Sequence, residues 1–158
     1  MINITPFLWF DDQAEEAVDF YLSVFPDSRV CQVSRYGDAG PGPAGSVMTI
    51  DFELGGNPFV ALNGGPAHYA FDESISFVVD CATAADVDHY WEGLLAGGGE
   101  EIACGWLRDR YGVRWQVVPA DLPALLGDPD PQRARRATEA MLSMKKLDID
   151  AMRAAAGA

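Results

Sequence analysis

Basic residues are scarce in this sequence. Eleven Lys and Arg stand against 24 Asp and Glu among 158 residues, which gives a formal net charge of −13. A protein that binds a phosphate backbone needs a basic surface, so this balance disfavours nucleic acid as a partner. It disfavours an anionic membrane for the same reason. Solubility of a small acidic protein is the simplest interpretation of the charge.

Cysteine and histidine are also few, with three and two residues. The cysteines at positions 31, 81 and 104 form no C-x-x-C pair, which argues against a zinc knuckle and a dithiol redox motif. No apolar run approaches the roughly 20 residues that span a bilayer. The first residues lack the basic and apolar regions of a signal peptide. These features together predict a cytoplasmic protein with reduced thiols.

The sequence does contain a repeat. An offset of 69 residues joins two segments that each read as a strand, residues 2–10 and 74–80, followed by an apolar stripe at helical spacing. Capping-box spacing at Asp12 and Glu15, and again at Thr83 and Asp86, predicts where the two helices begin. The pairs at this offset are Thr5 with Ser74, Asp11 with Asp80, Val18 with Val87, Asp19 with Asp88, Tyr21 with Tyr90 and Phe25 with Leu94.

Further strands follow each predicted helix, so each copy reads as β-α-β-β-β. The first copy places them at residues 29–36, 46–54 and 58–63, whereas the second shows two, at 101–107 and 113–119, with another obscured near residues 97–102. Asp130 and Pro131 then open a helix that is expected to run to about Lys145, and residues 148–156 suggest another. We therefore expect an α+β fold in one compact domain, with modules at residues 1–66 and 67–120 and a helical extension at 121–158.

Six strings of this sequence are similar to one family. The strings are residues 16–21 (EAVDFY), 61–66 (ALNGGP), 71–81 (FDESISFVVDC), 104–107 (CGWL), 109–119 (DRYGVRWQVVP) and 140–149 (AMLSMKKLDI). They resemble the PhnB-like branch of the vicinal-oxygen-chelate superfamily, which includes glyoxalase I, bleomycin-resistance proteins and extradiol dioxygenases. Members of the branch are often labelled 3-demethylubiquinone-9 3-methyltransferase. The resemblance covers nearly the whole chain, and it implies two βαβββ modules that form half-open barrels, and a homodimer.

The resemblance also indicates where a metal ion would lie. Metal enzymes of the superfamily hold a divalent ion with His and Glu from the first and last strands of each module. Here those positions fall on Thr5, Ser74 and Gln116, and residues 59–63 supply no carboxylate. Neutral hydroxyl and amide oxygens are weak ligands for such ions. No tightly bound metal and no other cofactor is therefore expected, and His68 and His89 are expected at the surface.

The alternation of side chains along a strand predicts a cavity instead. Its expected lining combines aromatic groups with neutral hydrogen-bonding groups, which is typical of a site for a small molecule. Trp9 and Trp106 have an alternative interpretation as filling of a barrel core. The candidate ligand-binding residues are Thr5, Phe7, Trp9, Ser74, Ser76, Cys104, Trp106 and Gln116.

Three functions remain open at this point. The chain binds a small molecule without a tightly held metal, or it is an enzyme of the superfamily, or it sequesters a drug as resistance proteins do. The enzyme would use a metal held jointly with substrate oxygens, or it would carry the methyltransferase activity of the family label. Methyl transfer finds no support in the sequence, because residues 37–45 suit a loop and residues 97–99 end a helix. Cys104 is better interpreted as a small packed residue than as a nucleophile.

Overall fold

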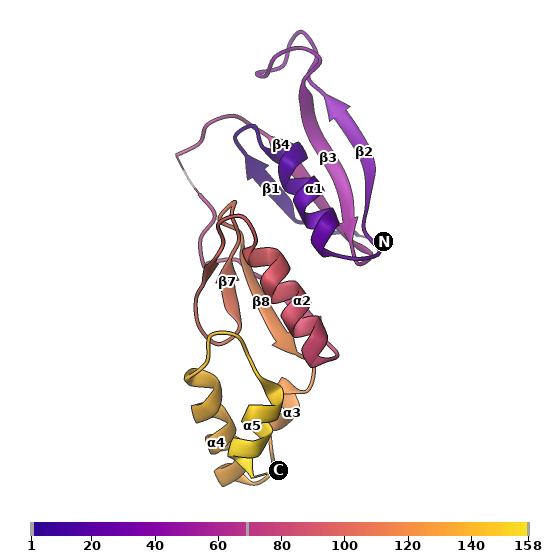
Figure 1. Ribbon diagram of the computed structural model, residues 1–158. Coiled ribbons are helices and arrows are strands. Elements are labelled where there is room, and N and C mark those ends of the chain that lie inside the picture. Colours follow the sequence, from indigo (N-terminus) through magenta and orange to yellow (C-terminus); the bar gives the residue numbers. More distant parts are fainter. Residues whose placement is uncertain (1, 69, 158) are drawn as a thin grey trace. The chain divides into compact units, whose positions relative to one another are not determined.

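The structure is a computed structural model that describes residues 2–68 and 70–157 (Figure 1). The chain divides into two compact units, residues 1–70 and 71–158. In both units a strand is followed by a helix and then by three strands, which confirms the predicted α+β class and the βαβββ repeat. Each described sheet has four strands and stays open, with its first and last strands in sequence lying parallel. No helix in the described ranges combines the length and apolarity needed to cross a bilayer.

The first unit forms a sheet in the order β1-β4-β3-β2, with α1 against one face (Figure 1). The strand β1 pairs with β4 in parallel, and the other neighbours are antiparallel. Along β3, the side chains of Ile50, Phe52 and Leu54 are buried, whereas those between them are only partly buried. One face of the sheet therefore meets the helix and the other stays open. The elements are β1 (Phe7–Phe10), α1 (Ala14–Val24), β2 (Arg29–Arg35), β3 (Val47–Leu54) and β4 (Asn57–Asn63).

The second unit repeats this plan in the order β5-β8-β7-β6, with α2 against one face. The two-residue strand β6 is the one that the sequence left obscured. Trp115 and Val117 on β8 are buried on the helix side, as predicted for Trp115, and Gln116 between them lies on the open side. The elements are β5 (Phe77–Cys81), α2 (Ala84–Leu95), β6 (Glu100–Glu101), β7 (Trp106–Arg108), β8 (Arg114–Pro119), α3 (Leu122–Leu126), α4 (Pro131–Leu142) and α5 (Ile149–Ala156).

The repeat is present, but its predicted offset of 69 is wrong. Each parallel pair of strands ends in the same way: Gly64 N donates to Phe10 O at 2.9 Å, and Ala120 N donates to Cys81 O at 2.8 Å. Phe10 therefore matches Cys81, an offset of 71. The helix N-caps, Gln13 and Thr83, differ by 70, because the second unit has one residue fewer between strand and cap. Identical residue types at neighbouring helix positions produced the wrong register.

Helix α1 is not capped by the predicted Asp12 and Glu15 pair. Its N-cap is Gln13, whose side chain makes no capping bond. The Oδ1 atom of Asn63, at the end of β4, accepts from the Ala14 N–H at 2.8 Å instead. A residue from a distant strand therefore satisfies the free amide of this helix, and it ties the helix to the sheet.

The other predicted caps are confirmed. Thr83 Oγ1 accepts from Asp86 N at 3.1 Å, and Asp86 Oδ2 accepts from Thr83 N at 2.9 Å, so α2 opens with a full capping box. Asp130 caps α4, with Pro131 at the first helical position. The helix suggested at residues 148–156 is α5, and Asp148, which was not predicted as its cap, accepts two of its backbone N–H groups.

Helix α4 ends at Leu142, before the predicted Lys145. The carbonyls of Met144 and Lys145 accept instead from the backbone N–H groups of Cys104 and Gly105, at 2.8 and 2.7 Å. The chain leaves the helix because these carbonyls serve as an extra pairing edge beside β7. The three C-terminal helices then bury a cluster of their own, made of Leu122, Leu125, Ala137, Leu147, Met152 and Ala156.

A buried carboxylate holds the turn between β7 and β8. Asp109 is 2% exposed. Its Oδ1 accepts from the backbone N–H groups of Tyr111 and Val113 at 2.9 and 3.0 Å, and its Oδ2 accepts from Trp115 Nε1 at 2.9 Å. The charge is buried together with the donors that it needs, so this side chain organises the hairpin.

Removal of this carboxylate should be costly. We expect Asp109→Ala to lower the free energy of unfolding by roughly 2–4 kcal/mol, because buried donors lose their acceptor. Urea denaturation followed by far-UV circular dichroism measures the change. Glu100→Ala is the matched control, since it removes an exposed carboxylate that pairs with Arg108 on the same sheet. An equally small effect of both substitutions would contradict this account of the turn.

The cysteines differ sharply in environment. Cys81, at the end of β5, is 2% exposed, whereas Cys31 on the edge strand β2 is exposed. Burial raises the pKa of the Cys81 thiol to about 11, and the nearby carboxylates of Asp86 and Asp80 add to the shift. Because the thiolate is the reactive form, Cys81 is unreactive for two reasons: reagents cannot reach it, and its thiol stays protonated at neutral pH.

Alkylation should therefore discriminate between these two thiols. In the folded protein at pH 8, we expect iodoacetamide to modify Cys31 while Cys81 stays unmodified, as measured by peptide mass spectrometry. Modification of Cys81 should rise only as the pH approaches its pKa of about 11, and both thiols should react in concentrated urea. Equal rates of modification at Cys31 and Cys81 in the folded protein would contradict the burial of Cys81.

Candidate functional site

The open face of the second sheet brings together three of the predicted residues. Gln116 on β8 lies directly between Trp106 on β7 and Val78 on β5 in the strand register. Its Nε2 donates to Ser76 Oγ at 2.9 Å. Val78 is 54% exposed, and the other three side chains are partly buried. Apolar and neutral polar groups therefore share one accessible row across this face.

A fixed ion pair borders the row. Arg114, which is on the same face of β8 as Gln116, donates to Glu73 Oε1 from Nη2 at 2.8 Å and from Nε at 3.0 Å. It also donates to the Gly112 carbonyl. The hydrogen bond from the guanidinium lowers the pKa of the Glu73 carboxyl. The side chain of Arg114 is 10% exposed, so its charge is held in place and matched by Glu73.

Ser74 does not join this row. The predicted strand 74–80 begins only at Phe77, and Ser74 lies in the turn before it. Both its N–H and its hydroxyl donate to Asp72 Oδ1, at 2.9 and 2.5 Å, and these bonds lower the pKa of the Asp72 carboxyl. The side chain of Ser74 is therefore used in a local hydrogen bond to Asp72, two residues earlier in the chain. The alternation pattern of the predicted strand did not indicate this bond.

Cys104 lies in the turn before β7. Its backbone adopts φ of 54°, and its thiol donates to the Met141 carbonyl at 3.6 Å. Together with its backbone bond to Met144, this contact binds the turn to the end of α4. The geometry supports a packing role for Cys104.

The open face of the first sheet carries exposed aromatic side chains. Phe7 is 58% exposed and Trp9 is 38% exposed. The Trp9 indole donates from Nε1 to Gly65 O at 2.9 Å, and its ring lies over Gly64, where an added Cβ would stand 2.3 Å from the indole. Gly64 and Gly65 therefore fix the edge of the ring, while part of its surface stays accessible.

The two open faces differ at matching positions. Phe7 pairs with Val60 as Val78 pairs with Gln116, so Val60 occupies the place of Gln116. Thr5 precedes β1, which begins at Phe7 and not at residue 2 as predicted, and it is exposed. At the strand offset of 71, Thr5 matches Ser76. The first unit therefore has a hydroxyl but no amide where the second has both.

Metal-ligating side chains are dispersed in the part of the chain that the structure describes. Within residues 2–68 and 70–157, no group of three His, Cys, Asp or Glu side chains converges as a metal site would need. His68 and His89 are both exposed, as the sequence predicted. His89 packs its ring edge-on against Tyr90, with 4.9 Å between ring centroids.

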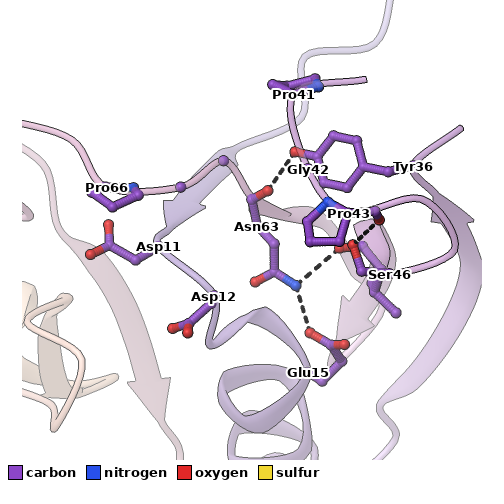
Figure 2. Close-up of a pocket in the computed structure, with 13 residues that line it drawn as sticks. Asp11, Asp12, Glu15, Tyr36, Pro41, Gly42, Pro43, Ser46, Asn63 and Pro66 are labelled. Carbon is purple, nitrogen blue, oxygen red and sulfur yellow. Dashed lines mark hydrogen bonds between the residues drawn. The ribbon is translucent and has the colours of Figure 1, made fainter. Parts of the chain in front are cut away.

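A cleft of about 550 Å³, which was not predicted from the sequence, lies elsewhere in the first unit (Figure 2). It lies at the carboxyl ends of β1 and β4, beside the start of α1 and the loop between β2 and β3. The residues that line it are Asp11, Asp12, Glu15, Tyr36, Pro41, Gly42, Pro43, Ser46, Val47, Asn63, Gly64, Gly65 and Pro66.

Asn63 is the centre of this cleft (Figure 2). Its Nδ2 donates to Glu15 Oε2 at 2.6 Å and to the Val47 carbonyl at 3.2 Å, and its backbone carbonyl accepts from the Tyr36 hydroxyl at 2.6 Å. With the cap of α1, these bonds join the helix, two strands and the loop. The only signal in the sequence was a polar residue at the end of an apolar strand, directly before Gly64 and Gly65. Asn63 thus links the elements that surround the cleft, and its polar groups have a structural role there.

Comparison with known proteins places this geometry in a family. The 3-demethylubiquinone-9 3-methyltransferase model matches residues 2–118. The PhnB protein from Bacillus cereus is 35% identical, and the alignment covers 75% of this chain and 100% of that protein with a TM-score of 0.68. No curated protein matches the chain.

More distant structures share the fold. Protein PA1353 from Pseudomonas aeruginosa is 22% identical over 74% of this chain and 96% of its own, with a TM-score of 0.61. The fosfomycin resistance protein FosX from Listeria monocytogenes is 14% identical over 78% of this chain and 94% of its own, with a TM-score of 0.57.

The family match is narrower than the predicted resemblance. It ends at residue 118, so the string at residues 140–149 and the helices α3, α4 and α5 lie beyond it. Within it lie both βαβββ units and both open faces. The family model confirms the predicted resemblance, and the 35% sequence identity with the Bacillus cereus protein agrees with it. The chain therefore belongs to the 3-demethylubiquinone-9 3-methyltransferase family, the PhnB-like branch of the vicinal-oxygen-chelate superfamily.

Proposed function

We propose that this protein binds a small, partly apolar molecule on the open faces of its sheets. The observation that carries the proposal is the row formed by Val78, Gln116 and Trp106, with Ser76 hydrogen-bonded to the amide. Accessible apolar side chains beside a few fixed polar groups are the usual surface of a ligand site. Phe7 and Trp9 give the first unit a comparable face.

The polar pair on the second face can orient a ligand. The bond between Gln116 and Ser76 uses one amide hydrogen and one lone pair of the hydroxyl oxygen. Within the described residues, the hydroxyl hydrogen of Ser76 and the Oε1 atom of Gln116 remain as a neighbouring donor and acceptor on this face. Arg114 does not add an unmatched charge, because Glu73 pairs with it. This face therefore suits a neutral ligand that carries both a donor and an acceptor.

The same groups make poor metal ligands. A catalytic divalent ion needs charged or imidazole donors that offset its loss of water. Gln116 and Ser76 offer neutral oxygens, and they bind each other. Binding without a tightly held metal is therefore the function that this donor set supports. We include a homodimer in the proposal, as the family resemblance implies, and a cytoplasmic location, which the cysteine pattern favours.

The methyl transfer in the family name lacks a comparable basis. A methyl-donor cofactor is commonly held where a glycine-rich turn leads from a strand into a helix. Here residues 97–99 follow α2, and residues 37–45 connect β2 to β3. Binding is therefore preferred over this activity.

Retention of metabolites tests the binding proposal. The purified protein is dialysed against a bacterial metabolite extract, and retained molecules are identified by mass spectrometry. We expect one small molecule to be retained, and Trp106→Ala and Gln116→Ala each to reduce its retention at least about tenfold through lost contacts. Glu100→Ala, an exposed change on the same sheet, serves as the control. No retention, or equal retention by all variants, would refute a site on this face.

Metal content gives a separate test. Elemental analysis of protein purified without chelator should find far less than one divalent ion per chain, and ligand retention should survive dialysis against EDTA. One ion per chain that is lost in Gln116→Ala would contradict the metal-free proposal, while leaving a ligand site on this face possible.

A further inference from the structure

The open face of the first sheet carries a carboxylate beside its aromatic groups. Asp51 on β3 lies between the buried side chains of Ile50 and Phe52, so its own side chain belongs to the open face. In the strand register, Asp51 is opposite Val60, and Val60 is opposite Phe7. One row across the sheet therefore leads from a carboxylate over an aliphatic side chain to an exposed aromatic ring.

Asp51 finds no partner for its charge among the residues that the structure describes. Among residues 2–68 and 70–157, no hydrogen bond or ion pair reaches its carboxylate, although it is partly buried. Glu53, two residues along the same face, is paired with Arg29 at 3.0 Å. A carboxylate that loses part of its water without gaining a cation is unfavourable. The charge of Asp51 is thus available to a ligand.

The aromatic end of the face offers ring surface and no free N–H. Trp9 donates its indole N–H to Gly65, and the row that contains it runs through Leu62 to Thr49, next to the row of Asp51. A ring that presents its π surface attracts cations as well as apolar groups. Two strand spacings separate β3 from β1, so roughly 10 Å lies between the carboxylate and the aromatic end.

We infer that the first open face recognises an organic cation whose apolar or aromatic body is linked to an ammonium-type charge. The inference rests on the proposed function and gives the ligand class for this face. The charge lies against Asp51, and the body covers Val60 and Leu62 towards Phe7 and Trp9. An anion is disfavoured by the two carboxylates of this face, and a bare metal ion would find a single unpaired carboxylate instead of several oxygen ligands.

A matched pair of probes tests this inference. Binding of 3-phenylpropylammonium and of 3-phenylpropan-1-ol is measured by ¹H–¹⁵N NMR titration, with the indole signal of Trp9 as the reporter and Trp9→Phe for its assignment. We expect the cation to bind about fivefold or more tightly than the alcohol, because a half-buried carboxylate adds about 1 kcal/mol. Asp51→Asn should remove this preference and bring the affinity for the cation close to that for the alcohol.

Glu53→Gln is the matched control, since it removes an equal charge from the same face and strand but from a carboxylate already paired with Arg29. It should retain the preference for the cation. If Glu53→Gln abolishes the preference as fully as Asp51→Asn, the effect is general electrostatics and the inference fails. The amide spectra of both variants report whether they fold.

The two probes also distinguish failure of this inference from failure of the proposed ligand-binding function. Equal binding of both probes to the unaltered protein, weakened alike by Phe7→Ala, would overturn cation recognition and leave a ligand face in place. If neither probe shifts the Trp9 signal at millimolar concentration, the first face is not a ligand site, and both the inference and that part of the proposed function fail.

Discussion

The parallel pairing of the first and last strands in each unit is the constraint on which the rest depends. It aligns Phe7 with Val60 and Val78 with Gln116, and it sets which side chains face the helix and which face outward. In the first unit it also delivers Asn63 to the start of α1, where a strand residue caps the helix. The same pairing therefore leaves one face of each sheet open and sets the centre of each open face, against which the antiparallel pairs place Asp51 and Trp106.

Duplication has given the two open faces one geometry and different chemistry. At equivalent positions, the second face carries the amide of Gln116, and the first carries the aliphatic Val60. Each face holds an ion pair, Arg114 with Glu73 on the second and Arg29 with Glu53 on the first, but the first also carries Asp51, for which residues 2–68 and 70–157 supply no cation. Because neither face gathers several charged or imidazole donors, we propose that both take an organic ligand in preference to a bound metal ion. The fold is kept while its chemistry has changed.

Much of the fold could be predicted because its signals are local. The capping box of Thr83 and Asp86 and the alternation along β8 each depend on residues a few positions apart. Predictions failed where distant or competing bonds prevailed. Asn63 replaced the expected cap of α1 from 49 residues away, and Asp72 drew Ser74 into a turn. Strand parity placed Ser76 and Gln116 on one face, but only the register of β5 against β8 makes them bonded neighbours.

An experimental structure of the protein with the molecule that it retains from a metabolite extract tests the central claim most directly. The account predicts that this molecule lies on an open sheet face, against Gln116 and Trp106 or against Phe7 and Trp9. A molecule seated instead in the cleft around Asn63, or held through a metal ion bound to Gln116, would contradict it.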